Sequence, residues 1–592
     1  MTTNVVAAVC DRRLSAVNEC HSILESSVTA PYEGAKMGKL TRRKFLRGGA
    51  ALTTASLMKP GIAKGRAAGP ESCERPNILI FMPDQQQGAT VLPEHPCLTP
   101  RVDRFASEGI LFNRAYCPAP HCCPSRASFQ TGLYPSEHGV FNNVDTDTAI
   151  HANPYPGLRF FSQTLSESGY NLTYSGKWHV ARDYFPEDFG WSNLNPSRKE
   201  AWSPVYIPGK TRQSNFWETA RKQLAETGPR HPGEVIRPGW ANTRLYGSYA
   251  PQGPHGFEGT SDYEIVRRGV EGLRTLAKGA KPWCLMVSNS GGHDKYVVPR
   301  NFADLYHPES VKLPASFRDT LMDKPRIYQR MRYEYWSQLS DGEVREAIVH
   351  YWAKLTMQDA LFGLLLDALE KTGQAENTLV LYTSDHGDYA GAHGLWAKGV
   401  PSFHEGYNIP CVVRWPRGIA NPGRRVDAFV STTDFAPTFL DAAGVPASEV
   451  RMSGHSLLPW LRGEGPANWR EAVFEQLNGV ELYYTQRIVM SRDYKYVYNG
   501  FDYDELYDLK QDPHEMVNLA FPDLNEARAQ VEQGRGLQSP GDVPWPPLEP
   551  RLAEARRDLL QRMWKFAQEH KDQIFNPYIT VAMAPLGPGV EL

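Results

Sequence analysis

The sequence predicts an α/β protein with a large, mostly parallel sheet, followed by a smaller α+β domain. Two observations carry this prediction. Between residues 75 and 470, continuous apolar runs typical of strands buried on both faces alternate with helical patterns, as they do in parallel sheets. Beyond residue 470 the pattern changes to short strands that follow one another closely. We therefore expect a first domain over residues 75–470 and a C-terminal α+β subdomain over residues 471–592.

In the first domain, apolar runs locate the strands and helical spacing locates the helices. Strands are expected at residues 77–82, 110–112, 171–175, 283–288 and 379–383. Helices are expected at residues 101–109, 162–168 and 344–371. Residues 180–259 are aromatic, proline-rich and irregular, which favours long loops over a sheet edge.

A short helix is also expected after the pair Cys122 and Cys123. Pro124 at the first helical position wastes no hydrogen-bond donor, and Gly132 can take the left-handed conformation that ends a helix. A group on either cysteine would then face the positive end of the helix dipole, with Arg126 one turn on, which favours a reactive group that handles anions. The alternative is a buried thiol pair packed under a helix.

The C-terminal subdomain begins with paired strands. Residues 487–490 and 494–498 have strand character, and residues 491–493 between them form the expected turn. A helix at residues 552–568 follows a proline-rich link. Together these elements predict a small α+β unit.

The composition is that of an ordinary large globular protein. The chain has 592 residues, of which 41% are hydrophobic and 22% charged, enough for two or three domains with a large core. The formal net charge of −2 argues against nucleic acid as the main partner. The 9 cysteines, an odd number spread along the chain, do not describe a small disulfide scaffold. The oligomeric state is not readable from the sequence.

Residues 1–68 are predicted to be an N-terminal extension that contains an export signal. Arg42 and Arg43 precede a weakly apolar run at residues 48–58, which is too short to span a bilayer. Paired arginines before such a run are typical of a twin-arginine signal, so we expect a periplasmic or secreted protein that uses the twin-arginine export machinery. The alternative is a basic amphipathic arm. Met37 is a second possible start, and small residues near Ala68 are compatible with cleavage.

Polar side chains follow two of the predicted strands directly. Asp84 and Gln85 come after the first strand, and Asp385 and His386 come after the strand at residues 379–383. Because ligands bind at the carboxyl ends of strands in open α/β sheets, these groups would meet and bind a divalent cation. Carboxylate and amide oxygens favour Ca²⁺ or Mg²⁺, and the imidazole leaves Mn²⁺ or Zn²⁺ open. The alternative is that each pair only caps a turn.

Further cations lie at or near other strand ends. These are Arg126, Lys177, His179, His293 and Lys398. Each alone is weak evidence, since a solvated lysine or a hydrogen-bonded histidine is common. Together with a metal they outline a strongly cationic pocket, which implies an anionic substrate.

The segment from Cys122 to Arg126 resembles the C-x-P-S-R signature of the type I sulfatases, in the alkaline phosphatase superfamily. The resemblance spans about residues 75–520. It includes the segments 76–84, 99–109, 132–135, 176–179, 384–387, 393–398, 505–509, 512–513 and 518–519. Counting back from Arg126 places the reactive position at Cys122, and Cys123 at the variable position.

The resemblance implies the alkaline-phosphatase-like fold, with a large mixed sheet, and a formylglycine made from Cys122 by a maturation enzyme. It also implies that Asp84, Gln85, Asp385 and His386 bind the metal together with the modified Cys122, with Ca²⁺ as the preferred ion. A twin-arginine route carries folded proteins, so this modification would precede export.

The resemblance further implies a role for each remaining cation. Lys177, Lys398 and the metal neutralise the sulfuryl oxygens, and His293 or Lys398 protonates the leaving alcohol. His179 removes the proton of the second hydroxyl of the hydrated aldehyde, so that sulfate leaves and the aldehyde is regenerated. Arg126 holds the modified residue and balances the carboxylates.

The substrate is expected to be a sulfated carbohydrate. Residues 180–259 contain aromatic side chains that could stack on a sugar ring. They are Trp191, Trp202, Tyr206, Trp217, Trp240 and Tyr246. The alternatives are that these residues pack a long insertion, and that the substrate is a small aryl or choline ester.

Two other functions stay open. Many sulfatases carry Asp where Gln85 stands and Asn where His386 stands, whereas the forms found here also occur in choline-sulfatase-like members and in phosphonate monoester hydrolases. The first rival is therefore a phosphonate or phosphate ester hydrolase on the same scaffold. The second is an exported anion-binding protein in which Cys122 stays a thiol.

Overall fold

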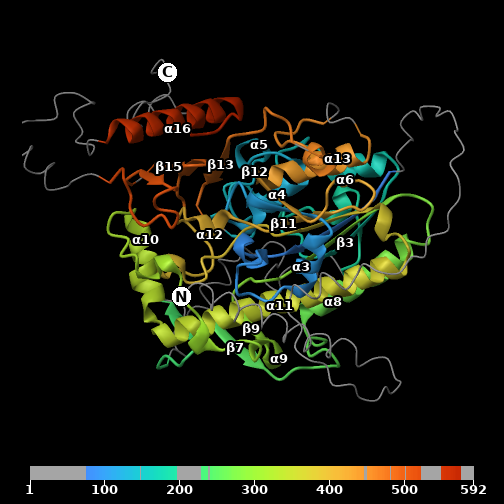
Figure 1. The fold of residues 1–592 in the computed structure, drawn as a ribbon, viewed down its shortest axis with the longest axis horizontal. Helices are drawn as coiled ribbons and strands as arrows, with labels where there is room; N and C mark the ends of the chain where they lie inside the picture. Colours follow the sequence, from blue (N-terminus) through green and yellow to red (C-terminus); the bar gives the residue numbers. More distant parts are fainter. Residues whose placement is uncertain are drawn as a thin grey trace, which may run out of the picture.

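The computed structural model describes residues 75–146, 148–195, 228–237, 241–445, 450–463, 465–479, 482–500, 502–521 and 548–574. Within them a central sheet of 8 strands has helices on both faces (Figure 1). Its strands are β1 (Asn77–Pro83), β2 (Ile110–Tyr116), β3 (Asn171–Gly176), β4 (Ser192–Asn193), β8 (Trp283–Asn289), β10 (Thr378–Thr383), β11 (Cys411–Arg414) and β12 (Arg424–Ser431). The predicted export signal at residues 1–68 lies outside the described residues.

The central sheet is mixed and mostly parallel, as predicted. The strand order is β12-β2-β11-β10-β1-β8-β3-β4. All neighbouring strands pair in parallel except β11, which is antiparallel to both β10 and β2. Strands β1 and β10, far apart in the sequence, are hydrogen-bonded neighbours at the centre.

Strand β1 is apolar from Ile78 onward because both faces of the sheet are covered. Ile78, Ile80 and Met82 share a core with the helices on one face, α4 (Cys122–Thr131), α6 (Phe161–Glu167) and α13 (Phe435–Ala442). Leu79 and Phe81 share a core with those on the other, α3 (Pro100–Ser107), α8 (Ser261–Leu276) and α11 (Asp341–Lys371). This is the continuous hydrophobic strand of a doubly covered sheet.

The longest of these helices begins at a capping box. Ser340 Oγ accepts a hydrogen bond from the backbone N–H of Glu343 at 3.3 Å, and the Glu343 side chain accepts one from the backbone N–H of Ser340 at 3.0 Å. The box satisfies two donors that have no intrahelical partner, and it starts α11 three residues before the predicted position at residue 344.

The helix at the cysteine pair begins earlier than predicted. Helix α4 starts at Cys122, so Pro124 is its third residue and not its first. A proline is still tolerated there because the first backbone N–H groups of a helix have no intrahelical acceptor. Gly132 ends the helix in the left-handed conformation, with a φ of 69°, as predicted.

The expectation of irregular loops over residues 180–259 is wrong for part of that stretch. The described residues include η2 (Pro186–Phe189), β5 (Glu234–Arg237), β6 (Ala241–Arg244) and β7 (Tyr246–Tyr249). Strand β7 pairs in parallel with β9 (Tyr296–Pro299), about fifty residues away. Strand β7 has four residues, of which only Tyr246 is buried, so its sequence has no apolar run that would indicate a strand.

Short helices complete the first domain. They are η1 (Gly88–Val91), α5 (Pro135–His138), α9 (Arg300–Ala303), η3 (Pro308–Ser310), η4 (Ala315–Arg318), α10 (Arg326–Arg330), η5 (Met331–Tyr335), η6 (Trp336–Gln338), η7 (Ala375–Asn377), η8 (Ala392–Gly394), α12 (His404–Tyr407), η9 (Thr432–Asp434) and α14 (Leu458–Arg462). None of the helices in the described part of the chain has both the length and the apolar character to cross a bilayer.

The C-terminal part is a small antiparallel sheet with one long helix. Strands β13 (Ala472–Leu477), β14 (Gln486–Ser491), β15 (Tyr494–Asn499) and β16 (Glu505–Asp508) follow in order, and helix α16 (Pro550–Glu569) shares a core with them. The predicted strands at residues 487–490 and 494–498 pair as expected. The α+β character is confirmed, and the boundary at residue 470 stays a prediction.

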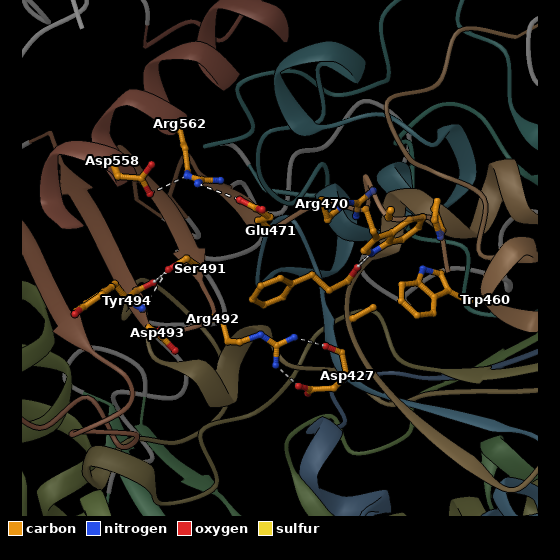
Figure 2. A pocket seen from close by; sticks show the side chains of 15 residues that line it. Asp427, Trp460, Arg470, Glu471, Ser491, Arg492, Asp493, Tyr494, Asp558 and Arg562 are labelled. Atoms are coloured by element: carbon orange, nitrogen blue, oxygen red, sulfur yellow. Dashed lines mark hydrogen bonds and ion pairs between the residues drawn. The ribbon is translucent and has the colours of Figure 1, made fainter. Parts of the chain in front are cut away.

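A pocket of about 740 Å³ lies where β12 meets the C-terminal sheet and α16 (Figure 2). Its arginines are paired with acids. Arg492 contacts Asp427, Arg562 contacts Asp558 at 2.8 Å, and Arg470 contacts Asp434 at 2.6 Å. The pair of Arg492 and Asp427 joins the turn between β14 and β15 to the edge of the central sheet. None of the predicted site residues lines this pocket.

Candidate active site

The predicted site residues gather at one end of the central sheet. Phe81 of β1 lies opposite Tyr382 of β10 in the parallel register, so Asp84 and Asp385 leave the sheet at the same edge. The carboxyl ends of β3 and β8 lie beside them, and these strands lead to Lys177 and to His293. The location agrees with the rule that ligands bind at the carboxyl ends of parallel strands.

Four donor groups meet at the centre of this site. Asp84, Cys122, Asp385 and His386 are buried, and one donor atom from each lies within 4.8 Å of all the others. Cys122 Sγ is 3.3 Å from His386 Nε2 and 3.8 Å from Asp84 Oδ1. Two carboxylates, an imidazole and a thiol form a donor set that fits a divalent cation.

His386 is oriented by its own backbone neighbour. Its Nδ1 lies 2.8 Å from the carbonyl oxygen of Gly387, and its Nε2 faces Cys122. A hydrogen bond of this kind selects the tautomer in which Nε2 is an acceptor or a metal ligand. The ring is therefore set to present a lone pair to the centre of the site.

Gln85 is held between two charged side chains. Its amide Nε2 donates to Asp388 Oδ2 at 2.6 Å, and its Oε1 accepts from Lys398 Nζ at 2.7 Å. Its backbone N–H donates to Asp385 Oδ1 at 3.0 Å. Tyr296 also donates to Asp388, at 2.6 Å. The structure therefore adds Asp388, which sequence reasoning missed, as the residue that determines which way the Gln85 amide points.

Arg126 bridges the two carboxylates. Its Nε lies 2.7 Å from Asp385 Oδ2, its Nη2 lies 2.9 Å from Asp84 Oδ2, and its Nη1 donates to Ser288 Oγ at 2.7 Å. The side chain is only 2% exposed. Burial favours the neutral guanidine, but the two carboxylates outweigh burial and raise the pKa of Arg126.

Cations surround Asp84 and Cys122. Lys177 Nζ lies 2.7 Å from Asp84 Oδ2. Burial and the neighbouring Cys122 oppose ionisation of Asp84, but Lys177 and Arg126 keep the pKa of its carboxyl well below the usual value. Burial likewise opposes ionisation of Cys122, while Lys177, Lys398, His386 and a hydrogen bond from His179 bring the pKa of its thiol well below the usual value.

Cys123 has a different environment. It is fully buried, its Sγ accepts from the backbone N–H of Val144 at 3.4 Å, and burial raises the pKa of its thiol. Adjacent cysteines therefore have opposite character: Cys122 joins Asp84, Asp385 and His386, whereas Cys123 Sγ lies within 4.8 Å of donor atoms of Asp145 and His179.

The two remaining predicted histidines have different partners. His293 Nε2 is 2.8 Å from Lys398 Nζ, and the carbonyl oxygen of His293 accepts from Lys354 at 2.6 Å. His179 Nε2 is 3.2 Å from Asp145 Oδ1. The structure thus brings all ten predicted site residues into one network. Asp145, Asp388, Ser288 and Lys354 are contacts that the sequence patterns did not indicate.

Two of the predicted aromatic platforms lie among the described residues, and their surroundings do not support the prediction. Trp191 is 3% exposed and its ring packs against Phe161 at 5.9 Å and Tyr174 at 5.6 Å. Tyr246 is 9% exposed and packs against His350 at 5.2 Å. These two rings fill cores and do not stack on a ligand. Trp202, Tyr206, Trp217 and Trp240 lie outside the described residues.

Comparisons with known proteins agree with this geometry. A family model described as Sulfatase matches residues 76–445, and one described as N-sulphoglucosamine sulphohydrolase, C-terminal, matches residues 391–534. The choline-sulfatase of Rhizobium meliloti is 30% identical over 478 residues, which cover 75% of this chain and 82% of that protein. The N-acetylglucosamine-6-O-sulfatase of Bacteroides thetaiotaomicron is 27% identical over 533 residues, which cover 78% of this chain and 85% of that protein.

A solved structure shares the fold. The phosphonate monoester hydrolase of Agrobacterium radiobacter superimposes with a TM-score of 0.59 and 23% identity, covering 78% of this chain and 95% of that chain.

Proposed function

The chain belongs to the sulfatase family, and we propose that it hydrolyses sulfate monoesters of a carbohydrate through a formylglycine made from Cys122 and a divalent metal. Membership of the family makes it a sulfuric ester hydrolase. The observation that carries the finer proposal is the position of Cys122, at the first turn of α4 and within 4.8 Å of donor atoms of Asp84, Asp385 and His386.

In this proposal Asp84, Gln85, Asp385, His386 and the modified Cys122 hold the metal, with Ca²⁺ as the preferred ion because most of the donors are oxygens. Mg²⁺, Mn²⁺ and Zn²⁺ are the alternatives. When bound, the ion supplies positive charge that stabilises an oxygen nucleophile and the sulfuryl oxygens. The hydrated formylglycine supplies two hydroxyl groups on one carbon, one to attack sulfur and one whose deprotonation expels sulfate.

The chain's own side chains supply the remaining charges. Lys177 and Lys398 neutralise the sulfuryl oxygens, and losing one such preorganised contact typically costs about 3–4 kcal/mol of transition-state stabilisation. Arg126 fixes Asp84 and Asp385, and its position one turn after Cys122 keeps the nucleophile in register with them.

Proton transfer is assigned to two separate groups. His293 or Lys398 protonates the leaving alcohol; their nitrogens are 2.8 Å apart, so one proton can be shared between them. His179 accepts the proton of the second hydroxyl, which is the step that releases sulfate.

The substrate class rests on the relatives. One acts on N-acetylglucosamine 6-O-sulfate and another on choline sulfate, by their names. We favour a sulfated carbohydrate and keep a small sulfate ester as the alternative.

The experiment uses full-length protein expressed with a formylglycine-generating enzyme. Mass spectrometry of the peptide that contains Cys122 tests the modification, and sulfate release from sulfated glycans and choline sulfate tests the activity. We expect an aldehyde at residue 122 and release from a glycan. An alkylatable thiol together with no hydrolysis would favour the anion-binding alternative.

The pairs Asp84–Gln85 and Asp385–His386 are forms that also occur in phosphonate monoester hydrolases, which makes one other reaction a candidate. A phosphonate or phosphate monoester hydrolase would use the same donors. Matched sulfate and phosphonate monoesters of one alcohol separate the two. A much larger kcat/KM on the phosphonate would overturn the sulfatase assignment of the substrate.

We also propose that the protein is exported through the twin-arginine route after maturation in the cytoplasm, on the strength of Arg42 and Arg43. The test replaces both arginines by lysine and follows the protein by fractionation. Retention of the variant in the cytoplasm is expected; unchanged export would refute the route.

A further inference from the structure

His179 is held in an unusual backbone conformation at the active site. It lies two residues after Lys177, its φ is 50°, and it is 6% exposed. A histidine at positive φ is uncommon and persists only where its surroundings determine it. Its Nε2 lies 3.2 Å from Asp145 Oδ1, and the imidazole also makes a hydrogen bond with the Cys122 side chain.

Asp145 is fixed by the segment that carries His179. Arg182, three residues after His179, donates from Nε to the carbonyl oxygen of Val144 at 2.6 Å and from Nη2 to that of Thr146 at 2.9 Å. The guanidinium group therefore holds the backbone on both sides of Asp145 by hydrogen bonds. The carboxylate and the imidazole are held in one local unit.

The loop that contains Asp145 also contacts Cys123, the neighbour of Cys122. The backbone N–H of Val144 donates to Cys123 Sγ at 3.4 Å, and the backbone N–H of Cys123 donates to Asn143 Oδ1 at 3.1 Å. The position of Asp145 is thus set from two sides, by α4 and by the segment after β3. Cys123 gains a structural role from this contact.

We propose that Asp145 is a positioning residue for His179. It accepts the Nε2 proton, so that the neutral ring keeps its Nδ1 lone pair for the hydroxyl proton at residue 122. The inference rests on the proposed function, because it concerns the step in which sulfate leaves.

Sulfate leaves when the free hydroxyl of the hydrated formylglycine loses its proton. The O–H bond of the free hydroxyl breaks and its proton goes to His179. The released electron pair forms the C=O bond, and the C–O bond to sulfate breaks, with its electrons leaving on sulfate. Asp145 balances the positive charge on the imidazolium, as carboxylates paired with catalytic histidines do.

A defect confined to this second step has a distinct kinetic signature. When the release of sulfate slows and limits turnover, kcat and KM fall by the same factor, and kcat/KM, which reports the first step, is unchanged. A general loss of structure lowers kcat/KM as well. The split between kcat and KM therefore separates positioning from folding.

The test compares Asp145→Ala with Asp183→Asn, which alters an exposed carboxylate one residue after Arg182. For Asp145→Ala we expect kcat to fall about tenfold to a hundredfold, part of the about 10²–10⁴ that a positioned general base contributes, with kcat/KM within about twofold. Asp145→Asn retains an acceptor and should restore part of kcat. Asp183→Asn should match the wild type.

A second readout does not depend on turnover. In ¹⁵N-histidine-labelled protein, the imidazole nitrogen shifts of His179 report its tautomer, and a His179→Gln sample identifies its signals. We expect the Nε2–H tautomer in the wild type and a mixture in Asp145→Ala. If circular dichroism shows that the alanine variant is unfolded, Asp145→Leu takes its place.

The outcomes separate the two proposals. An unchanged tautomer in the folded Asp145→Ala or Asp145→Leu variant, or equal losses in kcat and kcat/KM in that variant, would overturn the role of Asp145. A wild-type enzyme that carries formylglycine and cleaves no sulfate ester would overturn the proposed function, while the tautomer readout would still decide whether Asp145 sets the ring.

Discussion

Arg126 Nε lies 2.7 Å from Asp385 Oδ2, which links the first turns of α4 to the end of β10 by a fully buried ion pair. A second contact of the same guanidinium reaches Asp84 at 2.9 Å. One side chain therefore sets the spacing of two carboxylates that come from strands about three hundred residues apart in the sequence.

The first prediction concerns this pair. Arg126→Ala leaves two buried carboxylates close together without their shared cation, and breaking a buried pair in this way typically costs about 3–5 kcal/mol. We expect a loss of that size in the free energy of unfolding, measured by urea denaturation monitored by fluorescence.

The control for it is Arg104→Ala. Arg104 pairs with Glu108 on the surface of α3 at 3.1 Å and its side chain is 67% exposed. Its loss should change stability by no more than about 0.5 kcal/mol. Equal stabilities of the two alanine variants would show that the buried bridge contributes nothing.

The second prediction separates the two cysteines. Cys122→Ala removes the residue that the proposal converts to formylglycine, and turnover should fall below detection. Cys123→Ala deletes a buried thiol that lies outside the cluster of Asp84, Asp385 and His386, with an expected cost of about 1 kcal/mol in stability. It should retain formylglycine at residue 122 by mass spectrometry and a measurable part of the activity, because only the contact of Cys123 with the loop that holds Asp145 is lost. Comparable losses in both variants would contradict the assignment of Cys122.

The third prediction concerns pH and a residue remote from the site. Asp359, on α11, accepts from the backbone N–H groups of Val102 at 2.7 Å and Arg101 at 3.0 Å and so caps the start of α3. Burial raises the pKa of its carboxyl to about 7, although these two hydrogen bonds oppose the shift. Because the unfolded chain releases the proton near pH 4, the folded protein binds more protons between about pH 4 and pH 7.

Stability should therefore fall as pH rises through this window, by at most about 1.4 kcal/mol per pH unit, and change no further above it. Urea unfolding of the wild type and of Asp359→Asn at pH 5, 6 and 7 measures the difference. The variant should lack this part of the slope. Asp367→Asn, which alters a half-exposed carboxylate on the same helix, is the control. A wild-type slope in Asp359→Asn would refute the assignment.

The sequence was sufficient for the parts of the site that follow from strand topology. Asp84 and Asp385 each follow an apolar run directly, and carboxyl ends of parallel strands must share an edge, so their meeting could be predicted. Asp145 and Asp388 lie in loops without periodicity, and their contacts depend on how distant segments fold back. No local pattern indicates them.

The same dependence on distant segments explains why the surroundings of the aromatic residues and the start of α4 were not predicted correctly. Whether Trp191 faces a ligand or a core depends on Phe161 and Tyr174, which come from other elements. The start of α4 at Cys122 depends on where the chain leaves β2, and a proline is accepted anywhere in the first turn. Residue type alone cannot decide either point.

The last prediction concerns Asp388, which determines the direction of the Gln85 amide. Asp388 Oδ2 accepts from Gln85 Nε2 and from Tyr296 OH, each at 2.6 Å, while its other oxygen accepts from the backbone N–H groups of Ala390 at 2.8 Å and Ala397 at 3.1 Å. In Asp388→Asn an amide NH₂ must face donors, which leaves buried polar groups unpaired at about 1–3 kcal/mol.

In the proposed metal site, the Gln85 amide then loses the contact with Asp388 that fixes which way its oxygen points. Removing a residue that orients a ligand typically weakens metal binding by about tenfold to a hundredfold, and we expect that loss for Ca²⁺ by calorimetry on chelator-treated protein. Tyr296→Phe removes a donor from the same carboxylate and leaves Gln85 in place, so its Ca²⁺ affinity should match the wild type. Equal weakening in both variants would show that the carboxylate acts on the fold and not through Gln85.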